Sequence, residues 1–150
     1  MTAGAWLLAA TLGFALADTP AGVRVHVFTA TSASGQHTDE EKGRLAAVGD
    51  LRDALRKKKG LTIVDDAALA QIRVEVTSRE EREPPAGGFG GKAITSLGDY
   101  IIRVNVTAGD QQTELKGIGH GTWGRAAKDA SERILKWIAR HEPGKLQPGK

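Results

Sequence analysis

The chain has 150 residues, no cysteine and a formal net charge of +3, from 21 basic and 18 acidic side chains. A chain of this length typically forms one domain and can bury enough surface for a hydrophobic core without cross-links. The lack of cysteine excludes disulfides, thiolate metal sites and a cysteine nucleophile. The balanced charge and an aromatic content of 5% argue against nucleic-acid binding, since neither a basic stripe nor a base-stacking platform is evident.

The first 17 residues contain no charged side chain and include an apolar run that ends in small residues, Ala15 and Ala17, before a polar Asp-Thr-Pro segment. This pattern is typical of a secretory signal peptide with its cleavage site. The run is shorter than the roughly 20 residues that a transmembrane helix needs. We therefore predict export to the periplasm or the cell exterior, with no membrane span in the mature chain. The predicted organisation is a signal peptide at 1–17, a single domain at 18–142 and a flexible tail at 143–150.

Three segments, residues 23–27, 72–77 and 102–107, repeat one pattern in which β-branched residues alternate with polar ones. Because successive side chains of a strand point to opposite faces, each segment should bury its valines and isoleucines and expose its arginine. The strand at 102–107 is expected to begin at Tyr100, and a short strand is expected over residues 61–64. The alternation predicts a sheet with one apolar face and one hydrated face.

A hairpin is predicted to join the last two strands. Residues 108–110 form a turn signal, and residues 113–118 are expected to return as an antiparallel strand. The glycines that follow are expected to end the sheet. They are Gly117, Gly119 and Gly121.

A loop rich in proline and glycine, within residues 84–99, separates two of the strands. Its Gly91-Lys92 pair suggests a phosphate-binding loop, but Ala86 and Ala93 stand where that motif requires glycine and a hydroxyl residue. Nucleotide binding is therefore not expected there. Phe89 is an exposed apolar residue of the loop, which makes the loop either disordered or a tip that contacts a partner.

The first helix is predicted to begin at Thr38, where the Thr38 hydroxyl and the Glu41 carboxylate can form a capping box. Lysines at 57–59 and then Gly60 indicate its end. Residues 65–70 are interpreted as a short helical turn capped by aspartate. Apolar residues at helical spacing give the predicted buried stripe, Leu45, Val48, Leu51 and Leu55.

The second helix is predicted to begin near Thr122 or Trp123 and to end near His141. Its apolar residues recur at intervals of three and four, as expected of a helix that packs one face on a sheet. Its tryptophans are interpreted as packing residues rather than ligand platforms. The predicted face consists of Trp123, Ala127, Ala130, Ile134 and Ile138, widened by Leu135 and Trp137.

No motif indicates a particular chemistry. The four histidines lack the three- or four-residue spacing that puts two ligands on one helix face, and no serine lies in a Gly-x-Ser-x-Gly elbow. We therefore expect no metal, no cofactor and no enzymatic activity. The alternative is a small hydrolase acting on an envelope polymer, with His120 as its candidate base, because His120 lies in a glycine-rich turn as active-site histidines often do.

The order of elements, the acidic turn before residues 72–77 and the alanine-rich helix from Ala126 onward resemble the small α/β domain of bacterial envelope proteins. Examples are the curli secretion protein CsgG and the N-terminal domain of TolB. The resemblance spans most of residues 23–141 and is one of pattern, so it implies the fold and an envelope location. The lipid-anchor cysteine of the curli protein and an insertion for a pore strand are missing, so pore formation is not implied and no functional residue is carried over.

We predict a two-layer α/β sandwich in the order β-α-β-β-β-β-α, with a mostly antiparallel sheet of about five strands and both helices on one face. The leading hypothesis is an exported, non-enzymatic accessory or binding module of the cell envelope, whose expected partner is another envelope protein. The open face of the sheet is expected to carry Arg24, His26, Arg73, Glu75, Arg103 and Asn105. The predicted partner-binding residues are Arg73, Arg103 and Phe89.

Overall fold

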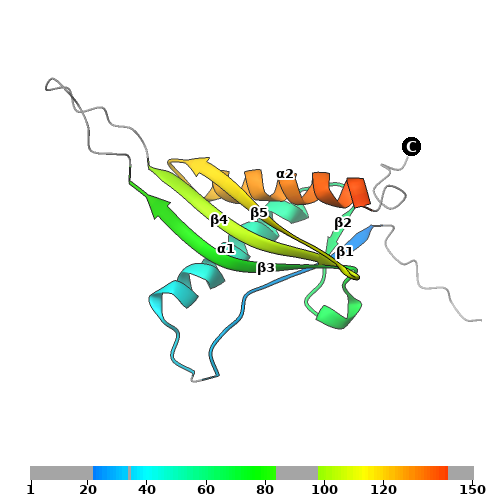
Figure 1. Cartoon of the computed structure of the whole chain (residues 1–150), viewed down its shortest axis with the longest axis horizontal. Helices are drawn as coiled ribbons and strands as arrows, with labels where there is room; N and C mark the ends of the chain where they lie inside the picture. The colour runs from blue at the N-terminus through cyan, green and yellow to red at the C-terminus, as the bar shows by residue number, and fades with distance from the viewer. Residues whose placement is uncertain (1–21, 34, 84–97, 142–150) are drawn as a thin grey trace, which may run out of the picture.

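The computed structural model describes residues 22–33, 35–83 and 98–141 (Figure 1). The predicted signal peptide at 1–17, the predicted tail at 143–150 and Phe89 lie outside these residues. Within the described part of the chain, no helix combines the length and the hydropathy needed to cross a membrane.

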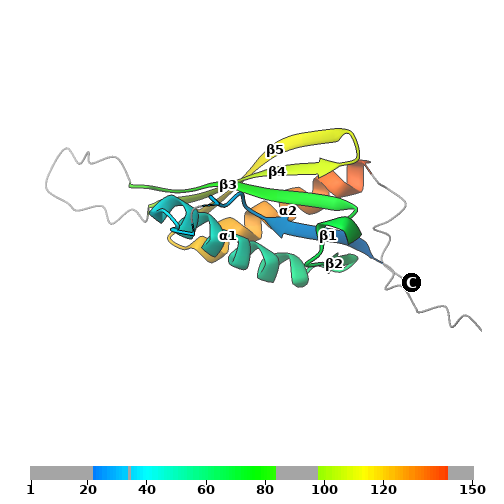
Figure 2. The same ribbon diagram turned by 90° about the horizontal axis from the view of Figure 1, so that it is seen from below.

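Five strands form one sheet, and two long helices cover one of its faces (Figures 1 and 2). The predicted fold class and element order are confirmed, and the predicted aspartate-capped turn is present as a short 3-10 helix, η1. In chain order the elements are β1 (Val23–Phe28), α1 (Asp39–Arg56), β2 (Leu61–Ile63), η1 (Ala67–Leu69), β3 (Ile72–Arg82), β4 (Asp99–Ala108), β5 (Gln111–His120) and α2 (Trp123–His141).

The strands lie in the order β2-β1-β3-β4-β5. β1 pairs in parallel with both β2 and β3, whereas β3, β4 and β5 pair in antiparallel fashion. The sheet is therefore mixed, and the predicted antiparallel arrangement holds for β3 to β5. Parallel neighbours need a crossover connection, which α1 supplies between β1 and β2. The β4–β5 hairpin closes through the predicted turn, in which Gly109 adopts φ 60°.

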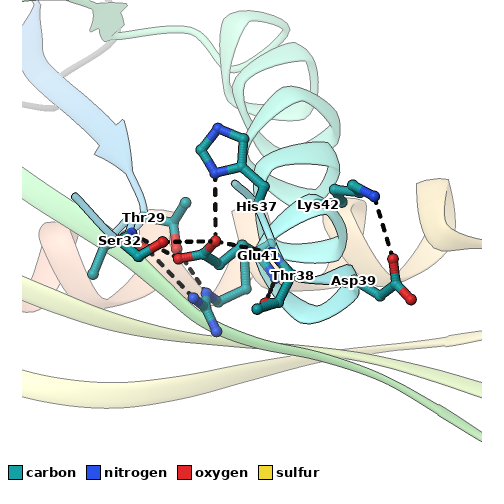
Figure 3. A network of polar contacts seen from close by, with 9 residues as sticks. Thr29, Ser32, His37, Thr38, Asp39, Glu41 and Lys42 are labelled. Atoms are coloured by element: carbon teal, nitrogen blue, oxygen red, sulfur yellow. Dashed lines mark hydrogen bonds and ion pairs between the residues drawn. The ribbon is translucent and has the colours of Figure 1, made fainter. Parts of the chain in front are cut away.

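The helix α1 begins with the predicted capping box (Figure 3). The Glu41 amide donates to the Thr38 hydroxyl at 3.2 Å, and the Glu41 carboxylate accepts from the Thr38 amide at 3.1 Å. The helix ends at Arg56, with Lys57 as its C-cap. Gly60, with φ 82°, then turns the chain toward β2, because glycine adopts this left-handed conformation without a steric penalty.

The carboxylate of Glu41 also holds the loop that precedes α1 (Figure 3). It is buried, and it accepts from the Ser32 amide at 2.7 Å and from the Ser32 hydroxyl at 3.2 Å, with His37 Nδ1 3.4 Å away. These hydrogen bonds, of which the one from the Ser32 amide has the largest effect, lower the pKa of Glu41 from 4.5 to about 2. One ionised side chain therefore fastens the β1–α1 connection to the helix.

The core lies between the sheet and the two helices. The β-branched residues of β1, β3 and β4 that alternate with polar ones are buried against the helices, as predicted, whereas Phe28 of β1 lies on the opposite face and Ile101 of β4 is buried outside this core. On α1 the predicted stripe is wrong at Leu45, which is 39% exposed, whereas Ala47 is fully buried. Two residues along a helix correspond to about 200° of rotation, so the two side chains lie on opposite sides. The largest fully buried side chains are Leu51, Leu55, Ile72, Ile102, Ile134 and Ile138.

The helix α2 packs closely on β5 because two positions of the strand have no side chain. A Cβ at Gly117 would lie 2.2 Å from the Ala126 carbonyl oxygen, and a Cβ at Gly119 would lie 2.2 Å from the Ala126 amide nitrogen. β5 continues to His120, so the prediction that the glycines end the sheet is wrong for Gly117 and Gly119, whereas Gly121 directly follows the last residue of the strand. Gly117 and Gly119 instead lie inside the strand and let the helix backbone approach it, which leaves Ala126 and Ala130 fully buried.

Candidate partner-binding face

The face of the sheet opposite the helices is the candidate site, and we call it the open face (Figure 2). The strand register places Arg73 beside Thr107 and Glu75 beside Asn105, and the buried residues between them face the helices. Arg103 lies on the same side of β4 as Asn105. The predicted position of these polar residues on one face is therefore confirmed.

The β1 end of the open face is partly covered by the segment 64–71. The Arg24 Nε donates to the Leu69 carbonyl oxygen at 2.6 Å, and the His26 Nδ1 lies 3.1 Å from the Val64 carbonyl oxygen. Both side chains are occupied in holding this segment against the sheet. The accessible part of the face is therefore smaller than the sequence predicted.

A shallow hollow of about 220 Å³ gathers Arg73 and Phe28 on the open face. The guanidinium carbon of Arg73 lies 5.2 Å from the centre of the Phe28 ring, and the same ring stacks on His26 at 5.4 Å. Arg73 is exposed, and within the described residues it forms no ion pair. The residues that line the hollow are Phe28, Arg73, Glu75, Asn105 and Thr107.

Arg103 differs from Arg73 because its charge is already matched within the chain. Its Nε lies 3.3 Å from Glu80 Oε1, and its Nη1 lies 3.4 Å from Glu114 Oε1. A hydrogen bond from the Ser78 hydroxyl, together with Arg103, lowers the pKa of Glu80 below its usual range. Of the two arginines predicted to bind a partner, Arg73 is therefore the one whose donors remain available.

A β-bulge in β3 creates a polar cluster that the sequence did not predict. The pairing with β4 shifts between Val76 and Ser78, so Arg79 points toward the helices. Its guanidinium carbon lies 4.0 Å from the centre of the Trp123 ring, and its Nη2 lies 3.2 Å from Asp50 Oδ2. Among the described residues its buried Nε has no hydrogen-bond partner. Arg79 links the start of α2 to α1, and the only signal in the sequence is the break in apolar alternation after Val76.

A larger hollow, of about 380 Å³, lies between the two helices rather than on the open face. Its lining includes Lys57, Lys58 and Lys128 together with Asp50 and Asp53. Charges of both signs meet there, and Lys58 forms a 3.5 Å ion pair with Glu132 of α2. This arrangement is typical of charged side chains along the contact between two helices and does not indicate a ligand site.

His120 forms a surface pair with a carboxylate. Its Nδ1 lies 2.5 Å from Asp99 Oδ1 across the β4–β5 pairing, and the two side chains are 73% and 44% exposed. The pair therefore lies in water rather than in an enclosed cavity. Among the described residues there is also no group of three or more potential metal ligands. The hydrolase alternative gains no support from this geometry.

No protein-family model matches the chain, and no curated protein matches it. Among solved structures it is similar to the N-terminal domain of Thermus thermophilus Protein Y, with 12% identity, 78% of this chain and 96% of that chain covered, and a TM-score of 0.36. It is also similar to the uncharacterized lipoprotein B of Nitrosomonas europaea, with 15% identity, 90% and 96% coverage and a TM-score of 0.43. The hypothetical protein CT253 of Chlamydia trachomatis has 12% identity, 83% and 98% coverage and a TM-score of 0.36.

These similarities carry no argument about function, because the identities and the TM-scores are low. None of the three structures is the curli secretion protein or TolB, so the resemblance to those envelope proteins is not supported here and stays a prediction.

Proposed function

We propose that this protein is an exported, non-enzymatic accessory or binding module of the cell envelope, and that the hollow beside Arg73 binds a partner through an exposed carboxylate. The observation that carries the proposal is an exposed guanidinium without an ion pair among the described residues, beside an aromatic ring in a hollow of the open face. Export is supported by the apolar run at residues 5–17, within the predicted signal peptide.

Within the hollow, Arg73 favours an acidic group on the partner, whereas the Glu75 carboxylate, which also lines the hollow, does not. A guanidinium presents a planar fork of donors that matches the two oxygens of a carboxylate. Phe28 adds apolar surface beside it, and aromatic and arginine side chains are enriched at the centres of protein interfaces. Asn105 and Thr107, which also line the hollow, can supply further hydrogen bonds.

The test is capture from a native envelope fraction by the immobilised mature protein, with the captured proteins then identified. Arg73→Glu should abolish capture of a specific partner, because it replaces attraction for a carboxylate by repulsion. The matched control is Lys59→Glu, which makes the same change of charge at an exposed position in the turn after α1. Equal capture by the wild type and both variants would contradict a role for the hollow.

Two further variants test the other two residues that are predicted to bind a partner. Arg103→Glu is expected to destabilise the fold, since the new carboxylate would lie beside those of Glu80 and Glu114. The amount of partner that this variant captures must therefore be compared with its measured stability. Phe89→Ala, in the loop outside the described residues, tests the predicted contact tip. Loss of capture in Phe89→Ala would extend the interface to that loop, and unchanged capture would confine it to the open face.

A further inference from the structure

The strand β5 is a long edge strand. It pairs with β4 on one side, and no other described strand pairs with its second side. The amide of Ile118 is directed away from β4 and donates to Asp129 Oδ2 of α2 at 2.9 Å. Outward-directed backbone groups recur at every second residue of an edge strand. The same outward direction therefore applies to Gln112, Glu114 and Lys116, all of which are exposed.

Lys116 occupies a position where its charge is not matched within the described residues. It lies directly opposite Arg103 in the β4–β5 register, and Arg103 already binds Glu80 and Glu114. Like charges directly opposite each other on neighbouring strands destabilise a sheet. Among the described residues Lys116 has no ion pair, so a carboxylate from outside the chain would relieve this arrangement.

We propose that two copies of this chain associate through β5, with the two strands antiparallel about a two-fold axis at Leu115. In this register, Glu114 of each copy lies opposite Lys116 of the partner subunit. Both residues have outward backbone groups, so each such pair can exchange both of its backbone hydrogen bonds. The outer edge of the strand is thus complementary to itself in charge and in hydrogen bonding.

The charges select this register over its neighbours. Moving the axis by one residue toward the start of β5 places Glu114 opposite Glu114 of the partner subunit. Moving it by one residue the other way places Lys116 opposite Lys116 of the partner subunit. Since like charges directly opposite each other are unfavourable, the register centred on Leu115 is the one in which both charges are matched.

The α2 side of the edge limits the length of the pairing. Leu115 borders a hollow of about 310 Å³ that is lined by Trp137 and by five charged residues of α2, namely Asp129, Glu132, Arg133, Lys136 and Arg140. Asp129, which also binds Arg133 at 2.9 Å, occupies the amide of Ile118 and ends the available edge. A ribbon this short buries little area, so the dimer is a weak one.

Sedimentation equilibrium of the mature chain over a range of concentrations tests the proposal. The wild type should pass from monomer to dimer as its concentration rises toward about 1 mM, the range expected for a weak interface. Lys116→Glu should weaken association about tenfold, because it converts two attractive pairs into two repulsive ones. Glu114→Lys should do the same, and the double variant E114K/K116E should restore association.

The controls separate pairing from other effects. Lys59→Glu changes the same charge away from the edge and should leave association unchanged. Thermal unfolding of each variant shows whether the fold is retained, which matters for Glu114→Lys because it also breaks the contact with Arg103. Arg73→Glu should not alter association, so failure of the dimer and failure of the proposed carboxylate site are distinguishable.

Three results would overturn the proposal. The first is a wild type that stays monomeric over the whole concentration range. That result would mean that Lys116 prevents association through the strand edge, as lysines on edge strands often do. The second is association that Lys116→Glu leaves unchanged, and the third is a folded double variant that does not recover association.

Discussion

Replacing Gly117 by alanine tests the close packing of α2 on β5. The new Cβ would lie 2.2 Å from the Ala126 carbonyl oxygen and 2.5 Å from both the Cβ and the amide nitrogen of Ala130. Carbon–oxygen contacts normally begin near 3.3 Å, so the helix must move by about 1 Å. Because the added atom meets helix backbone rather than a flexible side chain, the destabilisation should lie at the upper end of the range for overpacked cores. We expect the free energy of unfolding to fall by about 3 kcal/mol and Tm by roughly 10 °C.

The measurement is equilibrium urea denaturation followed by circular dichroism, with Gly49→Ala as the matched control. Gly49 lies within α1, and a Cβ there would have no neighbour within 4 Å. Because alanine restricts the unfolded chain and favours the helix, Gly49→Ala should raise the free energy of unfolding by about 0.5–1 kcal/mol. The same chemical change should thus have opposite signs at the two positions. A Gly117→Ala variant as stable as the wild type would refute the close approach of α2.

Four further substitutions test the core, the polar cluster and the cap of α1. Leu51→Ala removes a fully buried side chain and should lower the free energy of unfolding by about 2–5 kcal/mol in denaturant titrations; a loss below about 1 kcal/mol would place Leu51 outside the core. Arg79→Met should cost about 1–2 kcal/mol by removing the contacts with Trp123 and Asp50, and Asp50→Asn should cost less in that variant than in the wild type if the two side chains are coupled. The lowered pKa of Glu41 means that its carboxylate contributes stability that is fully present above pH 4.5 and is lost as the pH falls toward 2. The advantage of the wild type over Glu41→Gln, measured by denaturation at a series of pH values, should shrink across that interval, and a constant difference would contradict the assignment.

Local interactions explain why much of the fold could be predicted from the sequence. The capping box of Thr38 and Glu41 involves residues three apart, and its two hydrogen bonds follow from the geometry of any helix start. The alternation in residues 72–77 and 102–107 assigns each side chain to a face because successive residues of a strand point in opposite directions. The turn at residues 108–110 depends on one glycine that can adopt a positive φ.

The candidate site was predicted in part. Its placement on the face opposite the helices follows from alternation, so Arg73 and Arg103 were correctly assigned to one face. The sequence did not predict that Arg103, unlike Arg73, forms ion pairs within the chain. Its partners, Glu80 and Glu114, come from the strands on either side of β4. The role of either arginine in binding a partner stays a prediction.

By itself, the sequence determined the elements, their order and the apolar side of each strand, since these depend on neighbours a few residues apart. Only the tertiary structure decided the parallel pairing of β1, the bulge that turns Arg79 inward, and the covering of Arg24 and His26 by the segment 64–71. It also decided that Gly117 and Gly119 lie beneath a helix instead of ending a strand. The physical reason is that each of these features depends on contacts between residues distant in the chain, whose register no local pattern specifies.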